Sequence, residues 1–215
     1  MTYAVKEMFL TLQGEGARAG RRAVFLRFAG CNLWTGREED RASAVCRFCD
    51  TDFVGMDGEN GGRYEADALA DFAADIWGVD SARRYIVLTG GEPMLQVDDA
   101  LVDALHKRGF TIAIETNGTL PAHAGLDWVC VSPKAGSAVV QRSGDELKLI
   151  WPLPADPLPG HGVEDIEQWD FSHFLVQPLD EPGMTQANTA ACVDFVMARP
   201  SWRLSLQTHK LLGLK

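Results

Sequence analysis

Residues 30–53 read GCNLWTGREEDRASAVCRFCDTDF and contain three of the five cysteines of the chain. Cys46 and Cys49 form a C-x-x-C pair, and fourteen residues separate Cys31 from Cys46. A structural zinc site takes four protein ligands, whereas a four-iron cluster held by three thiolates leaves one iron open to a further molecule. Because three cysteines lie together rather than four, the sequence favours a 4Fe–4S cluster with an open iron.

A C-x-x-C pair alone is also typical of zinc ribbons and redox dithiols. A zinc site needs a fourth ligand, and the five histidines of the chain show no paired spacing. A redox dithiol would leave Cys31 without a role. Phe48, immediately before Cys49, resembles the aromatic residue commonly found at this place in radical S-adenosylmethionine (SAM) enzymes. Cys130 and Cys192 lie in apolar stretches, and we expect both to be small buried hydrophobic residues.

The composition limits the compartment and the partners. A chain of 215 residues with 46% hydrophobic and 23% charged residues is long enough for one domain with a full core. The net charge of −10 argues against a nucleic-acid backbone or an anionic membrane as the main partner. We see no apolar run of transmembrane length and no signal-peptide pattern. An odd number of cysteines without a secretory signal points to a reducing compartment, so we expect a cytoplasmic protein.

Short runs rich in Val, Ile, Leu and Phe alternate with helix-like segments. The expected strands are 23–30, 84–91, 111–118, 127–134, 146–152, 173–179 and 203–209, and the expected helices are 65–77, 97–108, 163–169 and 186–198. Such alternation implies parallel strands joined by crossover helices. Seven strands suit an α/β fold with an incomplete or modified (β/α) barrel over residues 1–215, although a doubly wound open sheet fits the same pattern.

Polar residues follow almost every expected strand: GCN, TGGEP, ETNG, SPK, QP and QTH. In parallel α/β folds the functional groups gather at the carboxyl ends of the strands. Turn formation alone explains the glycines and prolines, but it explains the repeated Glu, Lys, Gln and His less well. The pattern therefore favours the barrel, with a site at this end.

Two of the motifs are rich in glycine. TGGEP, residues 89–93, has two glycines that permit close backbone approach to a ligand, and Glu92 offers a negative charge to an ammonium group. LQGEG, residues 12–16, precedes the cysteine loop. Each motif taken alone is equally a tight turn or a loop with permissive glycines.

The order of LQGEG, RFAGCNLW, CRFCDTD, TGGEP, ETNG, SPK, VQP and QTHK resembles that of the 7-carboxy-7-deazaguanine synthase family, from residue 4 to the end of the sequence. The long spacer between the first two cysteines replaces the commoner C-x3-C-x2-C and occurs in some members of this family. The resemblance implies one radical SAM domain with an incomplete TIM-like barrel. It also implies a lyase of queuosine and 7-deazapurine biosynthesis, which converts 6-carboxy-5,6,7,8-tetrahydropterin to 7-carboxy-7-deazaguanine with loss of ammonia.

The resemblance also assigns residues to the cofactors and the substrate. Cys31, Cys46 and Cys49 would hold the 4Fe–4S cluster, which supplies the radical chemistry together with SAM. The residues expected to bind SAM are Phe48, Cys49, Asp50, Gly91, Glu92, Glu115, Asn117, Ser132, Pro133, Lys134 and Gln177. The residues expected to bind the substrate are Leu12, Gln13, Gly14, Glu15, Arg27, Thr89, His209 and Lys215. Thr51 is expected to bind Mg²⁺.

The residue types fit these roles. The forked donors of Arg27 suit a carboxylate, although a strand arginine equally pairs with a surface acid. The Glu15 carboxylate accepts the donors on the edge of a pterin. Mg²⁺ prefers hard oxygen ligands and keeps several waters, which fits Thr51 as its protein ligand, although the segment around it is equally a turn or a helix cap. In this family the C-terminal carboxylate reaches the substrate, and Lys215 departs from the family pattern there.

The same resemblance implies a homodimer and an electron donor such as flavodoxin, with no nucleic acid or membrane partner. Two other functions stay open. One is a radical SAM activating enzyme that forms a glycyl radical on a partner protein, and the other is a zinc-stabilised binding module. LQGEG and Arg27 favour a small polar substrate over a protein. Iron and a brown colour distinguish the cluster from a zinc module.

Overall fold

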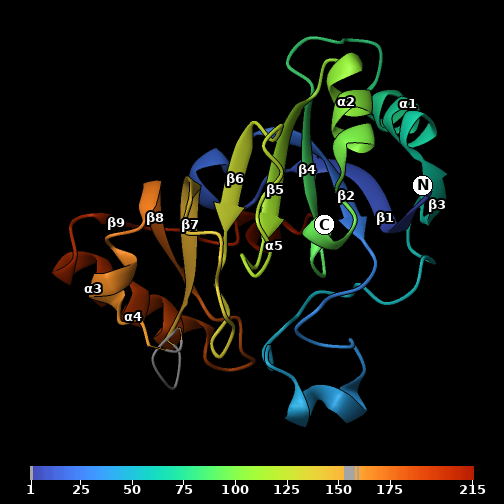
Figure 1. The fold of residues 1–215 in the computed structure, drawn as a ribbon. Helices are drawn as coiled ribbons and strands as arrows, with labels where there is room; N and C mark the ends of the chain where they lie inside the picture. Colours follow the sequence, from blue (N-terminus) through green and yellow to red (C-terminus); the bar gives the residue numbers. More distant parts are fainter. Residues whose placement is uncertain (1, 153–157, 159) are drawn as a thin grey trace.

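The computed structural model describes residues 2–152, 158 and 160–215, and these form one nine-stranded sheet (Figure 1). The strand order is β3-β1-β2-β4-β5-β6-β7-β8-β9. The strands are β1 (Thr2–Leu12), β2 (Arg22–Phe28), β3 (Gly62–Glu65), β4 (Tyr85–Gly90), β5 (Thr111–Thr116), β6 (Trp128–Val131), β7 (Ser143–Trp151), β8 (Asp170–Pro178) and β9 (Trp202–Leu204). Neighbours from β2 to β9 are parallel, whereas β1 pairs antiparallel with β2 and β3. The sheet does not close, since β3 and β9 are its two edges, and the predicted incomplete barrel is confirmed.

All seven expected strands are present, and together they are the parallel part of the sheet. The sequence analysis missed β1 and β3. The pairing of β1 with β2 shifts register between Val5 and Glu7, which disturbs its alternation, and β3 has only four residues. The strand expected over 203–209 is wrong in its second half. The chain leaves the sheet there because the amide and the hydroxyl of Thr208 both donate to the Gly14 carbonyl oxygen, at 2.9 and 2.8 Å.

The expected helices are confirmed, with the third one shorter than expected. They are α1 (Ala66–Trp77), α2 (Asp99–Lys107), α3 (Val163–Ile166) and α4 (Thr185–Ala198), and a fifth, α5 (Thr208–Leu212), follows β9. Short 3₁₀ turns are η1 (Gly16–Arg18), η2 (Glu38–Ser43) and η3 (Pro93–Leu95). Within the described ranges, every helix is too short or too polar to cross a membrane.

The helices cover the outer face of the sheet in two groups (Figure 1). In the first apolar core, α1 and α2 pack on β1, β2, β4 and β5, with Leu69 and Leu88 fully buried. In the second, α3 and α4 pack on β7, β8 and β9, with Leu147 and Leu149 fully buried. Because side chains alternate along a strand, residues between these leucines, such as Lys148, face the inner side. The inner face is therefore free for polar groups.

We expect Leu88→Ala to lower the free energy of unfolding by about 2–5 kcal/mol, because it removes a fully buried side chain from the first core. Val79 is fully exposed, so Val79→Ala should change the free energy by less than about 0.5 kcal/mol. Urea unfolding followed by circular dichroism measures both. Equal stability of the two variants would contradict the assignment of this core.

Candidate active site

A cavity of about 360 Å³ opens at the carboxyl ends of the parallel strands and is lined by residues from most of the expected motifs. The expected residues that line it are Leu12, Gln13, Gly14, Glu15, Arg27, Cys46, Phe48, Cys49, Asp50, Thr51, Thr89, Gly91, Glu115, Ser132, Lys134, Gln177, His209 and Lys215. Four expected residues are not among the lining: Cys31, Glu92, Asn117 and Pro133. Lining residues that the sequence analysis missed include Glu7, Phe9, Phe25, Lys148, Gln207 and Lys210.

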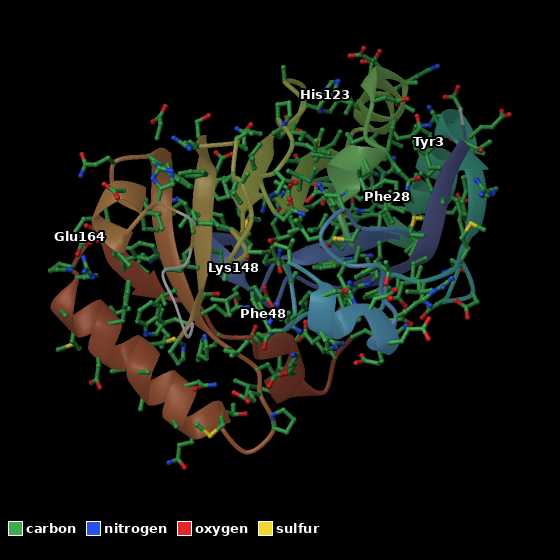
Figure 2. All side chains as sticks on the ribbon, turned by 60° about the horizontal axis from the view of Figure 1, so that its bottom comes forward. Tyr3, Phe28, Phe48, His123, Lys148 and Glu164 are labelled. Atoms are coloured by element: carbon green, nitrogen blue, oxygen red, sulfur yellow. The ribbon has the colours of Figure 1, made fainter. Side chains whose placement is uncertain are left out.

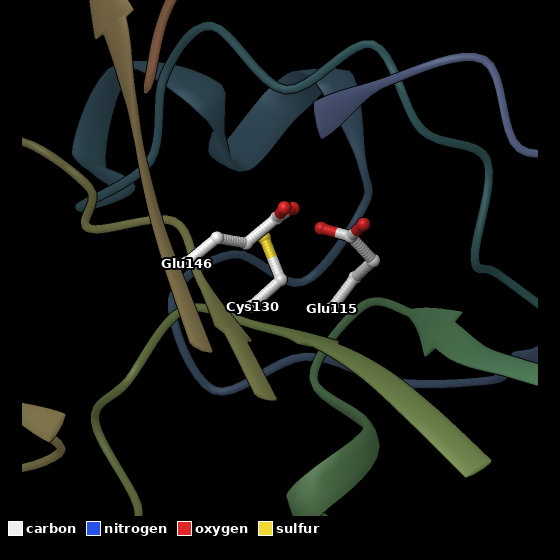
Figure 3. Close-up of side chains that lie close together, drawn as sticks. All are labelled: Glu115, Cys130 and Glu146. Atoms are coloured by element: carbon white, nitrogen blue, oxygen red, sulfur yellow. The ribbon is translucent and has the colours of Figure 1, made fainter. Parts of the chain in front are cut away.

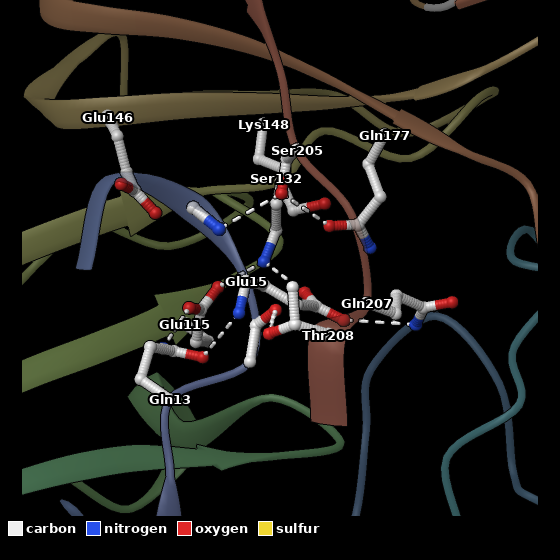
Figure 4. A network of polar contacts seen from close by, with 12 residues as sticks. Gln13, Glu15, Glu115, Ser132, Glu146, Lys148, Gln177, Ser205, Gln207 and Thr208 are labelled. Atoms are coloured by element: carbon white, nitrogen blue, oxygen red, sulfur yellow. Dashed lines mark hydrogen bonds and ion pairs between the residues drawn. The ribbon is translucent and has the colours of Figure 1, made fainter. Parts of the chain in front are cut away.

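Lys148 on β7 is the buried cation of this cavity, and it lies near the middle of the molecule, as does Phe48 (Figure 2). Its Nζ contacts Glu15 Oε2 at 2.5 Å and Glu115 Oε2 at 3.0 Å (Figure 4). Gln13 Nε2 donates to the other oxygen of Glu115 at 3.2 Å. One buried ammonium group thus joins β7, β5 and the segment after β1. The signal in the sequence was a lysine between leucines in ELKLIW, a charge within an otherwise apolar strand.

The environment of this group fixes its charge state. Burial alone would raise the pKa of Glu15, but the charge of Lys148 and hydrogen bonds from Lys148 and Gln207 lower it to about 2. Burial alone would lower the pKa of Lys148, but the carboxylates of Glu115 and Glu15 hold it well above its usual value. Both partners are therefore charged at neutral pH, and Glu15 presents a fixed anion to the cavity.

Hydrogen bonds also hold the backbone of the segment after β1, at Gly16 and Ala17. Glu146 Oε2 accepts a hydrogen bond from the Ala17 amide at 2.8 Å. Ser205 Oγ accepts from the Gly16 amide and donates to Gln177 Oε1, both at 2.9 Å (Figure 4). Gly16 has φ = 71°, and a Cβ there would lie 2.3 Å from Glu146 Oε1, so only glycine fits at this position. The second glycine of LQGEG is thus required by this contact.

Glu146 also lies close to Glu115 and Cys130: a carboxylate oxygen of each glutamate and the Cys130 Sγ lie within 4.8 Å of one another (Figure 3). Both glutamates already have protein partners, since the Glu115 carboxylate pairs with Lys148 and the Glu146 carboxylate accepts a hydrogen bond from the Ala17 amide. Burial, followed by the charge of Glu115, raises the pKa of Glu146. Cys130 and Cys192 are both fully buried, as expected, although Cys130 faces carboxylates rather than only apolar groups.

The three cysteines of the long loop form no disulfide. A hydrogen bond from Cys46 lowers the pKa of Cys49 to about 6, and the same bond together with burial raises the pKa of Cys46. The positive charge of Lys134 acts on both cysteines and favours their thiolates. Cys31 accepts a hydrogen bond from the Leu33 amide at 3.4 Å. Cysteines that form no disulfide and feel a lysine charge fit a group that binds thiolates, such as a 4Fe–4S cluster.

One wall of the cavity combines a charged group with a flat apolar surface. The rings of Phe9 and Phe25 stack with centroids 5.9 Å apart. Arg27 Nε donates to Glu7 Oε1 at 2.9 Å, and Lys215 Nζ contacts Glu7 Oε2 at 3.0 Å. Arg27 thus both lines the cavity and pairs with an acid, but this acid is largely buried rather than on the surface.

Two residues of α5, His209 and Lys210, also line the cavity. His209 lies against Gly14, where a Cβ would come within 2.1 Å of His209 Nδ1. Burial is the main reason that the pKa of His209 is lowered. Lys210 Nζ contacts Asp50 Oδ2 at 2.8 Å and Asp180 Oδ2 at 2.5 Å. The motif QTHK therefore links the LQGEG segment, the cysteine loop and the end of β8.

Comparisons with known proteins agree with these motifs. The model of the radical SAM superfamily matches residues 41–145. The chain is 59% identical to the 7-carboxy-7-deazaguanine synthase of Burkholderia multivorans and 60% identical to that of Bradyrhizobium diazoefficiens, over the whole of each chain. The crystal structure of QueE from Escherichia coli matches with a TM-score of 0.70 and 28% identity, over 97% of this chain and 95% of that one.

We expect Lys148→Met to lower the free energy of unfolding by about 3–5 kcal/mol at pH 7, because it leaves Glu15 and Glu115 unpaired. The depressed pKa of Glu15 means that its contribution in the wild type is complete above about pH 4.5 and is lost as pH falls through about 2. The difference between the two proteins should therefore shrink over that range. Urea unfolding across pH measures it.

Lys107 is an exposed lysine of α2, and Lys107→Met serves as the matched control. It should change the stability by less than about 0.5 kcal/mol at every pH. A pH-independent loss in Lys148→Met would show that packing, rather than the ion pairs, accounts for the effect.

Proposed function

The chain belongs to the 7-carboxy-7-deazaguanine synthase family, and we propose that it converts 6-carboxy-5,6,7,8-tetrahydropterin to 7-carboxy-7-deazaguanine with loss of ammonia. The observation that carries this proposal is the convergence of the cysteine pair, Arg27 and the charged Glu15 on one cavity. The alternatives of an activating enzyme and a zinc module have no comparable support, since the full-length relatives are named as synthases.

The first role of the protein is to hold its cofactors. Cys31, Cys46 and Cys49 would bind a 4Fe–4S cluster, with SAM beside it. When bound, the cluster and SAM supply a radical that removes a hydrogen atom from the substrate. The cavity next to Cys46 and Cys49 gives SAM a place to bind. The residues proposed to line the SAM site are Phe48, Asp50, Gly91, Glu115, Ser132, Lys134 and Gln177.

The second role is to orient a flat, charged substrate. The stacked rings of Phe9 and Phe25 offer an apolar surface to a pterin. Arg27 offers its remaining guanidinium donors to the 6-carboxylate, because only its Nε is used by Glu7. Glu15, held as an anion by Lys148, accepts from the amino-pyrimidinone edge. These groups place charge at both ends of the ring system, which fits a substrate that bears a carboxylate.

The proposal extends to Mg²⁺, to partners and to compartment. Thr51 lines the cavity directly after the cysteine pair, where a magnesium ion on its oxygen could also reach a substrate carboxylate. We further propose that residues 1–215 act as a single radical SAM domain. A flavodoxin-type electron donor and a reducing cytoplasm suit a cluster that must be kept reduced, and the proposal also includes a homodimer.

Anaerobically reconstituted enzyme with SAM, a reductant and the carboxypterin is expected to form 7-carboxy-7-deazaguanine, detected by mass spectrometry. Cys46→Ala should abolish SAM cleavage, because it removes a cluster ligand. Cys192→Ala, which changes a buried cysteine far from the other three in the sequence, should retain cleavage and serves as the matched control. Full activity of Cys46→Ala, or no deazaguanine from wild-type enzyme, would refute the proposal.

We expect wild-type turnover to depend on Mg²⁺ and Thr51→Ala to weaken that response while its iron content stays unchanged. Turnover is measured during titration with Mg²⁺ after removal of divalent ions by chelation. Thr35 is an exposed residue of the same loop, so Thr35→Ala is the control. Wild-type turnover that is unaffected by chelation would contradict the magnesium assignment.

A further inference from the structure

Cys31 lies outside the C-x-x-C pair, so its position depends on what holds its own segment. It lies three residues after β2, between Gly30 and Asn32, and η2 separates it from Cys46. Only two residues separate Cys46 from Cys49, so the short C-x-x-C segment itself keeps them near each other. Backbone bonds tie the Cys31 segment to the pair: the Val45 and Cys46 amides donate to the Leu33 carbonyl oxygen at 3.1 and 3.4 Å, and the Gly30 amide donates to the Phe53 carbonyl oxygen at 3.1 Å. The bonds that fix this segment to the rest of the sheet come from the loops after β4 and β5.

The motif after β4 holds the Gly30 side of this cysteine. The Glu92 amide donates to the Gly30 carbonyl oxygen at 3.0 Å. A Cβ at Gly91 would lie 2.1 Å from Gly30 O and 2.7 Å from Cys31 Cβ. The two segments therefore touch at backbone distance, and a side chain at position 91 would displace Cys31.

The segment after β5 holds the Asn32 side. Asn117 Nδ2 donates to Asn32 Oδ1 at 3.0 Å, and Asn32 Nδ2 donates to Thr119 Oγ1 at 2.7 Å. Asn117 Oδ1 accepts from the Thr119 amide at 2.9 Å. Both ends of the Asn117 side-chain amide are thus used within the protein, and the bonds close a ring between β5 and the cysteine loop.

The Glu92 carboxylate connects the two sides. It is fully buried and accepts hydrogen bonds from the backbone amide of Asn117 at 2.8 Å, from Thr116 Oγ1 at 2.7 Å and from the backbone amide of Met94 at 2.9 Å. A carboxylate only accepts hydrogen bonds, and three protein donors already reach its two oxygens. The carboxylate is also fully buried and is not among the residues that line the cavity, so an ammonium group of a ligand there has no open access to it.

We propose that Glu92 and Asn117 are positioning residues for Cys31 and do not contact SAM with their side chains. Glu92 fixes Gly30 through its amide and fixes Asn117 through its carboxylate, and Asn117 then fixes Asn32. Cys31 is held on both sides by these bonds. This inference rests on the proposed function, because it requires a cluster at the three cysteines. Partners of this kind, one step removed from a metal, commonly control how tightly the metal is bound.

The test measures iron rather than turnover. We expect Asn117→Ala and Asn32→Ala each to release iron to a chelator faster than wild type, on the order of tenfold, after anaerobic reconstitution. The double variant should release iron no faster than the faster single variant, because both changes break the same link. Equilibrium dialysis of the loaded proteins should give the wild-type dissociation constant for SAM. Ser43→Ala, an exposed change on the same loop, is the control and should match wild type.

Asn32 is exposed, so its variant tests the link without a change in the core, and far-UV circular dichroism confirms its fold. Wild-type iron release by Asn32→Ala would overturn the proposal. So would normal iron release by Asn117→Ala with SAM binding weakened by about tenfold or more, which would make Asn117 a SAM ligand. Failure of the wild-type protein to bind iron would instead refute the proposed function.

Discussion

The buried ammonium group of Lys148 is the constraint on which the site depends. A charge in this position is tolerated only with close partners, because its removal from water costs several kcal/mol. Its partners are Glu115 on β5 and Glu15 on the segment after β1. That segment belongs to no strand, so the ladder of the sheet does not by itself place its side chains. The ion pairs hold Glu15 in the cavity, and the hydrogen bonds of Glu146 and Ser205 hold the backbone behind it.

The outer face of the sheet stabilises the fold, and the inner face forms part of the cavity. On the outer face, leucines of β7 pack under α3 and α4 and supply the apolar burial that stabilises the strand. On the inner face, Lys148, between the buried Leu147 and Leu149, supplies a charged group to the cavity. Because β2, β4 and β5 pair in parallel, their carboxyl ends lie at the same edge of the sheet, and the loops that follow them lie side by side there. Cys31, Gly91 and Asn117 come from those loops, which is why distant motifs lie together.

The sequence predicted the parallel strands well because each is an apolar run that ends in polar residues. It missed β1, whose register shift disturbs the alternation, and it extended β9 into a segment that Thr208 turns toward Gly14. Motif residues such as Arg27 and Glu15 were found. Lys148 was missed, because a charge in an apolar strand cannot be assigned to a face until the curvature of the sheet is known. The sequence likewise suggested Glu92 as an ammonium receptor, but only the fold shows how many protein donors already reach it.

The central claim is that the segment Gln13–Ala17 is fixed to the inner face of the sheet, and amide hydrogen exchange of Gly16 and Ala17 tests it most directly. The two amides donate to Ser205 and Glu146, so the account predicts exchange as slow as that of the strand amides around them. Their rates can be compared with those of Val79, an exposed position after α1. Exchange of Gly16 and Ala17 as fast as that of Val79 would contradict the account, since the segment would then be a surface loop.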